Sequence, residues 1–215
     1  MALPSEKLIT INDRGARAAT TFGSLSAGGA NMVFIKKLTA SSSATLSFVD
    51  GASSVVLDDT YKEYLFTFKD IHAATDNVEF QFNVSIDGGS NYNVAKTTTY
   101  FRTYNYEDGS DAALGYRTPR DLAQGTGFQA LTEGQGNGND ESCSGQLTIF
   151  NPSDTTFVKH FIARNSMYGR TDYEMDIYVA GYANTTSAVD AVQFKFSSGN
   201  IDAGVIKMYG VGPKQ

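Results

Sequence analysis

The side chains that most often perform chemistry are few in this sequence and lie far apart. There are two histidines, His72 and His160, and one cysteine, Cys143. A zinc site needs three or four protein ligands in one cluster, and these separated residues do not predict one. Cys143 closely follows two acids, Asp140 and Glu141, which disfavour a reactive thiolate. A single cysteine also excludes an intrachain disulfide.

Motifs of two large enzyme classes are absent from the sequence. Gly-x-Ser-x-Gly, which positions the serine of many hydrolases, does not occur, and neither does the phosphate-binding pattern Gly-x-x-x-x-Gly-Lys-Ser/Thr. Residues 134–140 are rich in glycine, but no predicted helix follows them, so we interpret them as an exposed loop. We therefore predict no catalytic residue, no cofactor and no enzymatic activity.

Carboxylates were considered as acid–base pairs of the kind that glycosidases use. Asp58 and Asp59 are adjacent and would point in opposite directions on an extended backbone, so a turn is the better interpretation. Glu79 belongs to the polar face of a predicted strand. The loops 87–91 and 137–141 offer oxygen ligands but lack the twelve-residue calcium-loop pattern. We interpret both as solvated loops and predict no metal site.

An aromatic and β-branched strand is predicted at residues 97–106. Its tyrosines are open to two interpretations. Tyrosine rings stack on sugars in carbohydrate-binding sandwiches, and they also fill protein cores and subunit interfaces.

Alternation of apolar and polar residues indicates the elements that carry these groups. Residues 78–86 alternate five apolar with four polar side chains, and this period of two places all the apolar groups on one face of a strand. Residues 61–68 likewise place Tyr64, Phe66 and Phe68 on one face. We expect two half-buried strands that share one core, with 78–86 as a central strand.

The whole chain favours an all-β fold. No helical period is sustained, and strands with little helix between them pair antiparallel. We predict an antiparallel, jelly-roll-like β-sandwich over residues 31–215. A long polar connection spans 107–144, with one helical turn at 119–124 and short extended structure at 125–131, and His72 begins a loop at 72–77. About ten strands are expected, at 32–38, 44–49, 61–68, 78–86, 97–106, 146–150, 156–164, 174–182, 191–196 and 205–211.

Composition excludes two kinds of partner. The chain of 215 residues carries a formal net charge of −6, and its densest basic group is the pair Lys36-Lys37. Binding to a nucleic-acid backbone needs many clustered basic groups, so no nucleic acid is expected. No run approaches the ~20 apolar residues that span a bilayer. Because no secretory signal pattern is present, we expect a soluble protein made in a cytoplasm.

Residues 1–30 contain too little apolar mass for a core, although 8–11 are compatible with a short strand. We interpret this segment as an extended N-terminal arm. It is either a tail or an arm that becomes ordered against a neighbouring subunit.

Several segments resemble a β-sandwich module of tailed bacteriophages that infect aquatic bacteria, including cyanobacteria. The resemblance covers roughly residues 34–211. Family members are virion structural proteins, and the resemblance therefore implies a non-enzymatic particle component. The segments are 58–68 (Asp-Asp-Thr-Tyr-Lys-Glu-Tyr-Leu-Phe-Thr-Phe), 101–104 (Phe-Arg-Thr-Tyr), 150–161 (Phe-Asn-Pro-Ser-Asp-Thr-Thr-Phe-Val-Lys-His-Phe), 180–195 (Ala-Gly-Tyr-Ala-Asn-Thr-Thr-Ser-Ala-Val-Asp-Ala-Val-Gln-Phe-Lys) and 197–210 (Ser-Ser-Gly-Asn-Ile-Asp-Ala-Gly-Val-Ile-Lys-Met-Tyr-Gly).

The resemblance is compatible with two places in a virion. One is the head exterior, where a homotrimeric decoration or cement protein binds the major capsid protein. The other is the tail, where a fibre or tip adhesin contacts other tail proteins and grips a host surface glycan. A fibre usually needs a coiled-coil or repeated shaft, and the sequence has neither. The expectation is therefore a decoration protein, made in the host cytoplasm.

Overall fold

A computed structural model describes residues 32–212 of the chain, which contain twelve strands and one short 3₁₀ helix. The elements are β1 (Met32–Thr39), β2 (Leu46–Val49), β3 (Glu63–Ala73), β4 (Phe80–Ser85), β5 (Lys96–Tyr106), β6 (Ala112–Tyr116), η1 (Thr118–Arg120), β7 (Gln129–Ala130), β8 (Cys143–Phe150), β9 (Lys159–Gly169), β10 (Tyr173–Ala183), β11 (Ala191–Phe196) and β12 (Ile201–Val211).

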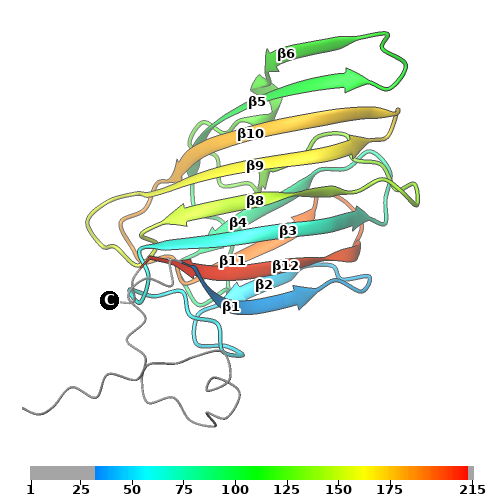
Figure 1. Ribbon diagram of the computed structural model, residues 1–215. Coiled ribbons are helices and arrows are strands. Elements are labelled where there is room, and N and C mark those ends of the chain that lie inside the picture. The colour runs from blue at the N-terminus through cyan, green and yellow to red at the C-terminus, as the bar shows by residue number, and fades with distance from the viewer. Residues whose placement is uncertain (1–31, 213–215) are drawn as a thin grey trace, which may run out of the picture.

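The strands form two sheets, and every pairing between named strands is antiparallel. One sheet has eight strands in the order β1-β12-β3-β8-β9-β10-β5-β6, and the other has four in the order β2-β11-β4-β7. Figure 1 shows the large sheet in front of the small one. The predicted all-β, antiparallel class is confirmed.

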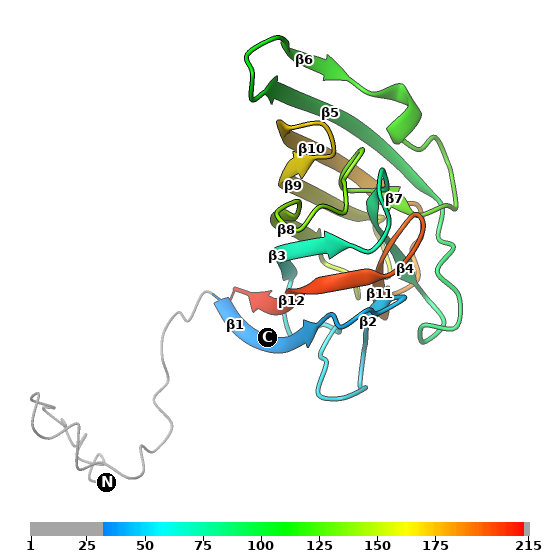
Figure 2. The same ribbon diagram turned by 90° about the vertical axis from the view of Figure 1, so that its right-hand side faces the viewer.

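Eight of the strands have the connectivity of a jelly roll. The order β1-β12-β3-β8 faces the order β2-β11-β4-β7, and each step along these strands, except β4 to β7, crosses to the other sheet. This is the double Greek-key arrangement of jelly rolls. Two further pairs, β5–β6 and β9–β10, are inserted between jelly-roll strands and widen only one sheet. Figure 2 shows β5 and β6 extending beyond the small sheet.

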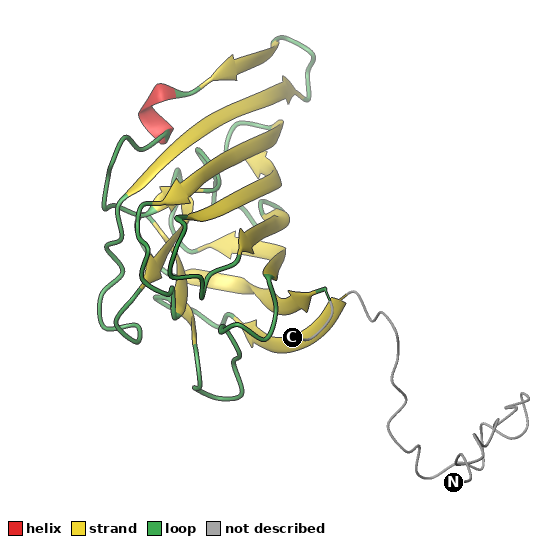
Figure 3. Ribbon diagram, turned by 90° about the vertical axis from the view of Figure 1, so that its left-hand side faces the viewer, coloured by secondary structure: helices red, strands yellow, loops and turns green. Residues whose placement is uncertain are grey.

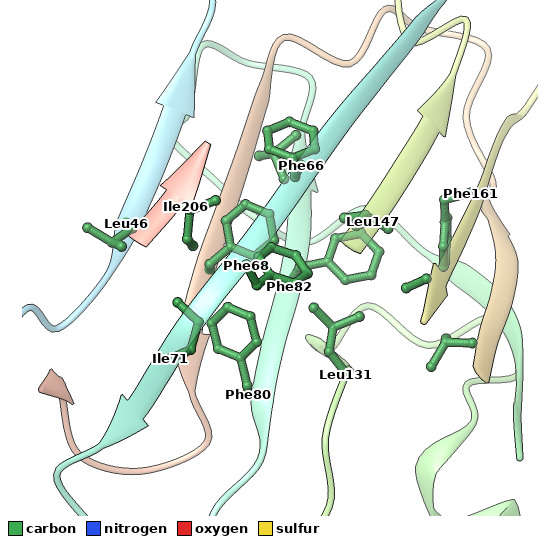
Figure 4. Close-up of a cluster of buried hydrophobic side chains, with 14 of the residues drawn as sticks. Leu46, Phe66, Phe68, Ile71, Phe80, Phe82, Leu131, Leu147, Phe161 and Ile206 are labelled. Carbon is green, nitrogen blue, oxygen red and sulfur yellow. The ribbon is translucent and has the colours of Figure 1, made fainter. Parts of the chain in front are cut away.

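The core between the sheets is dominated by phenylalanine. Phe194 of β11 lies among five other phenylalanine rings, with centroid separations of 5.2 to 6.5 Å. Those rings come from the small sheet (Phe48, Phe80 and Phe82) and from β3 of the large sheet (Phe66 and Phe68). Figure 4 shows that side chains from both sheets meet in this layer.

Two strands lie where the sequence predicted a polar connection. β6 and β7 both fall within residues 107–144, and β7 lies in the short extended structure predicted at 125–131. All five residues of β6 are exposed, so burial imposes no alternating pattern on them. The predicted helical turn at 119–124 corresponds to η1, which begins one residue earlier and is shorter. Figure 3 shows η1 as the single helical element, directly after β6.

The prediction for residues 78–86 needs one correction. β4 does lie inside the small sheet, between β11 and β7. However, its expected polar face is not exposed, because Asn83 and Ser85 are fully buried. The amide Nδ2 of Asn83 donates to the backbone oxygens of Tyr92 (2.6 Å) and Thr126 (3.0 Å). Loops therefore cover this face and satisfy its polar groups.

Two loop predictions also need correction, one in its extent and the other in its exposure. His72 lies in β3, because the strand continues past an irregularity at Asp70, where φ is +50° and the pairing register shifts. In the glycine-rich segment 134–140, Gln135 is fully buried and its Nε2 donates to the backbone oxygen of Ile71 at 2.6 Å. The polar side chain is held inside because a core carbonyl accepts its hydrogen bond.

The predicted N-terminal arm 1–30, including the short strand at 8–11, falls outside the described residues. Within residues 32–212, no helix has the length and apolar character needed to cross a membrane.

Candidate functional site

The structure does not bring the histidines and the cysteine together. His72 contacts the carbonyl oxygen of Gly138 through Nε2 (2.9 Å) and lies 3.5 Å from the Asp202 carboxylate through Nδ1. His160 is exposed on β9, beside the ring of Tyr182. Cys143 is fully buried, and burial raises the pKa of its thiol. Within the part of the chain that the structure describes, no three His, Cys, Asp or Glu residues gather as metal ligands.

The acidic loop residues stabilise their own turns. Asp58 accepts the backbone N–H of Thr60 at 2.8 Å, which confirms the predicted turn. Asp87 accepts Nδ2 of Asn91 at 2.7 Å and the hydroxyl of Ser85 at 2.7 Å. These hydrogen bonds, chiefly those from Asn91, lower the pKa of Asp87 to about 2. The carboxylate oxygens are thus engaged within the loop.

A different group of residues forms a polar pocket of about 270 Å³. We call it the arginine–tyrosine pocket, since three arginines (Arg102, Arg120 and Arg170) and three tyrosines (Tyr104, Tyr106 and Tyr173) line it. It lies against β5 and β10, on the side of the large sheet that also faces the core.

The two-residue period of a β-strand explains why three of the lining residues lie together. Arg102, Tyr104 and Tyr106 are alternate residues of β5 and therefore share one face. Tyr106 pairs with Tyr173 of β10, and their ring centroids are 5.3 Å apart. The guanidinium of Arg102 lies over the Tyr104 ring, 5.0 Å from its centroid. The three tyrosines thus form an aromatic wall beside an arginine, with their rings tilted or edge-on to one another.

The carboxylate of Glu133 holds three arginines in place. Its side chain is 8% exposed. Arg117 donates to it through both Nε (3.0 Å) and Nη2, and the Nε atoms of Arg102 and Arg120 each lie 3.5 Å from its oxygens. Burial acts to raise the pKa of Glu133, but the Arg117 hydrogen bonds and the three positive charges outweigh it, so the pKa is lowered. Glu133 is therefore a buried anion that orients guanidinium groups.

The pocket keeps an excess of positive charge. Its lining has three arginines and one carboxylate. Counting the charged partners of the lining residues adds Arg117, Glu79, which accepts Nη2 of Arg120 at 2.8 Å, and Asp111, which accepts the Tyr104 hydroxyl at 2.7 Å, and the balance is then plus one. Each guanidinium has five N–H donors, and those donors are not all used. The buried Nε of Arg120 makes no hydrogen bond, and Arg170 has no ion pair with any residue between 32 and 212.

A second feature lies on the outer face, which is the side of the large sheet turned away from the small sheet. Five exposed or half-buried apolar side chains run across β9, β10, β5 and β6 in neighbouring positions. We call these the apolar strip: Ile162, Tyr178, Phe101, Tyr116 and Leu114. The rings of Phe101 and Tyr178 are stacked at 4.9 Å with an angle of 2°. A groove of about 500 Å³ lies beside Ile162.

The charged groups near the apolar strip are paired within the chain. Arg164 lies 4.9 Å above the Tyr178 ring and binds the carboxylate of Asp176 through Nε (3.0 Å) and Nη2 (2.9 Å). The hydroxyl of Ser166 donates to Glu174 at 2.8 Å. This part of the outer face therefore offers shape and apolar area rather than an unpaired charge.

No protein-family model, curated protein or solved structure matches this chain. The site is therefore described by its own geometry.

The sequence predicted no binding residue, although one of its open alternatives included two residues of the pocket. The sugar-stacking interpretation of strand 97–106 contained Tyr104 and Tyr106, while Tyr100 of the same strand is a fully buried core residue. The arginines were missed because Arg102, Arg120 and Arg170 are distant in sequence. The alternation of arginine with tyrosines in Arg102-Thr-Tyr-Asn-Tyr was the one available signal. Glu79, considered as a catalytic acid, instead pairs with Arg120.

Proposed function

We propose that this chain is a non-enzymatic structural protein of a tailed-bacteriophage virion, a decoration protein that binds the major capsid protein on the head exterior. The apolar strip on the outer face supports an assembling protein, because large exposed apolar patches mark protein–protein contacts, and below it is assigned to the contact between copies of this chain. The sequence segments quoted above support the virion assignment. The jelly roll is compatible with it, since many viral capsid domains have this fold, although a fold alone does not define a function.

The proposed mechanism is stabilisation by selective binding. A protein that binds only the assembled shell stabilises that shell by mass action. Several weak contacts made together by one oligomer gain affinity through effective concentration. A rigid sandwich suits this role, because little conformational freedom is lost when it docks.

Electron cryo-microscopy of particles with and without this protein tests the location. We expect density on the head surface, repeated with the capsid lattice, and earlier rupture of undecorated heads on heating. Density confined to the tail, with heads of unchanged stability, would contradict the decoration proposal.

We further propose that the apolar strip contacts a second copy of this chain in a homotrimer. Arg164 and Asp176 neutralise each other beside the strip, so this pair does not repel the same pair on a second copy. We expect sedimentation velocity to give a trimer for the wild type and a monomer for Ile162→Asp, because the new carboxylate would lose its water at the interface.

Ile86→Asp is the matched control for that experiment. Ile86 is also an exposed isoleucine (42%, against 54% for Ile162), but it follows β4 in the small sheet. We expect this variant to remain trimeric. A monomeric or dimeric wild type, or a trimer that survives Ile162→Asp, contradicts the proposed interface.

The arginine–tyrosine pocket favours a second candidate, a tail-fibre or tail-tip adhesin that grips a host surface glycan. A polar cavity with an aromatic wall is a common form of a small-ligand site. Tail density in the same microscopy experiment, together with host adsorption lost when the protein is removed, supports this candidate.

A further inference from the structure

We infer that the arginine–tyrosine pocket binds an acidic saccharide, with the sugar ring against the tyrosines and its carboxylate on the arginines. The inference deepens the adhesin candidate, because it names the class of glycan, and it shares with that candidate the premise that the pocket takes a sugar. It holds equally for a protein on the head or on the tail, since it concerns the isolated chain.

Charge determines the anionic part of the ligand. The lining carries two more positive than negative groups, and Glu133 is already engaged by Arg117. Arginine presents parallel N–H donors that match the two oxygens of a carboxylate. Because the Glu133 carboxylate fixes the guanidinium groups that surround it, their N–H donors are oriented before a ligand arrives.

Partial burial strengthens this attraction. The side chains of Arg102 and Arg120 are only 19% and 30% exposed. Charges at a partly buried site are less screened by water than charges on an open surface. Arg170 is exposed and has no ion pair with any residue between 32 and 212, so its donors are free for a ligand carboxylate, whereas Nε of Arg120 is buried against Glu133.

Aromatic packing determines the saccharide part. Tyr104, Tyr106 and Tyr173 contact one another, with ring centroids 5.3 to 6.5 Å apart. The face of an aromatic ring is electronegative, and one face of a sugar ring presents polarised C–H groups that fit against it. A bare inorganic anion would leave this aromatic wall unused, and a neutral sugar would leave the arginine donors unused.

Calorimetric titration of the full chain tests the inference with three probes. We expect an oligogalacturonate to bind, its fully methyl-esterified form to bind at least tenfold more weakly, and sodium sulfate alone to bind at least tenfold more weakly. Equal binding of the acid and the ester would overturn the role of the arginines. Sulfate binding as tight as the oligosaccharide would overturn the saccharide, and no binding of the oligogalacturonate would overturn the whole inference.

Variants locate the binding in the pocket. Arg170 is exposed in the turn between β9 and β10, so Arg170→Gln should leave the fold intact and weaken the oligogalacturonate at least fivefold. Tyr104→Leu should weaken it similarly through the lost ring face. Arg164→Gln is the control. Like Arg102 of the pocket, Arg164 has a carboxylate partner and lies over a tyrosine ring, but it is on the outer face. Affinity lost only in the control, or unchanged in both pocket variants, would overturn the assignment.

These outcomes are separable from those of the proposed function. Oligogalacturonate binding by a protein found on the head contradicts the adhesin location and leaves the pocket assignment standing. Tail density with no binding of the oligogalacturonate supports the adhesin location and overturns the acidic ligand.

Discussion

Replacing Lys96 with methionine is expected to remove most of the pH dependence of stability between pH 7 and pH 10. Lys96 is fully buried at the start of β5. Its Nζ donates to two neutral acceptors, Oδ1 of Asn83 (2.5 Å) and the backbone oxygen of Val94 (2.8 Å). No described carboxylate forms an ion pair with it. Burial therefore lowers the pKa of Lys96 to about 7.

The direction of the effect follows from proton linkage. In the unfolded chain the amine titrates near its ordinary pKa of ~10.4. Between about pH 7 and pH 10 the unfolded state therefore binds more protons, and the free energy of unfolding rises with pH. Below pH 7 both states are protonated, and the cost of burying the ammonium is fully present. Across this whole pH window, the free energy of unfolding should rise by an amount on the order of 4 kcal/mol.

The Lys96→Met variant should have a higher free energy of unfolding than the wild type at low pH and a lower one at high pH. At pH 6.5 it should be the more stable protein, because a buried charge has been replaced by an apolar chain of similar length. At pH 9.5 it should be less stable by about 1–3 kcal/mol, because Asn83 and Val94 lose the donor they share. Urea unfolding at several pH values measures both differences.

Lys37→Met, at an exposed position of β1, is the control and should leave the pH profile of the wild type unchanged. Lys159 also lies buried, across Ala183 from Lys96, and burial lowers its pKa as well. A residual slope in Lys96→Met is therefore expected from Lys159. A Lys96→Met profile as steep as that of the wild type would contradict the assignment to Lys96.

Truncating Phe194 to alanine should lower the free energy of unfolding by about 3–5 kcal/mol. Its ring is fully buried and touches aromatic rings of both sheets. The substitution would therefore leave a cavity between the two sheets and remove the packing contacts that join them. Urea denaturation measures the loss, and an unchanged m-value would show that the denatured state is unaffected.

The exposed Phe157 offers the matching change outside the core. With 69% of its surface exposed, Phe157→Ala should alter stability by no more than ~0.5 kcal/mol. A loss for Phe194→Ala as small as that for Phe157→Ala would mean that the aromatic layer does not hold the sheets together.

The sequence predicts those parts of the fold in which burial imposes a period of two. Residues 61–68 and 174–182 alternate clearly, and they form β3 and β10, with one face against the core. β6 was missed because Ala112–Tyr116 is exposed on both sides and has no pattern to read. The burial of Asn83 and Ser85 was missed because polar residues in a strand usually indicate a solvent-exposed face. They are buried here because a distant loop supplies hydrogen-bond partners, and the sequence of the strand does not show that loop.

The candidate site was predictable only where it lies on one strand. Alternation placed Tyr104 and Tyr106 on the face they share with Arg102. The remaining pocket residues come from the turn at Arg170 and from the segment around Arg120 and Glu133. Their meeting depends on the antiparallel order of β10 and β5, a long-range pairing that local sequence does not encode.

The last strand of the jelly roll has a consequence for synthesis. β12 lies between β1 and β3 and, among the strands of residues 32–212, is the one paired with β1. While the ribosome is still adding residues before Ile201, β1 has no neighbour in its sheet and β3 has an open edge. Unpaired strand edges recruit other chains, so nascent copies on one messenger are most prone to aggregation until residues 201–211 have emerged. Release of residues 201–211 closes the sheet and removes that hazard.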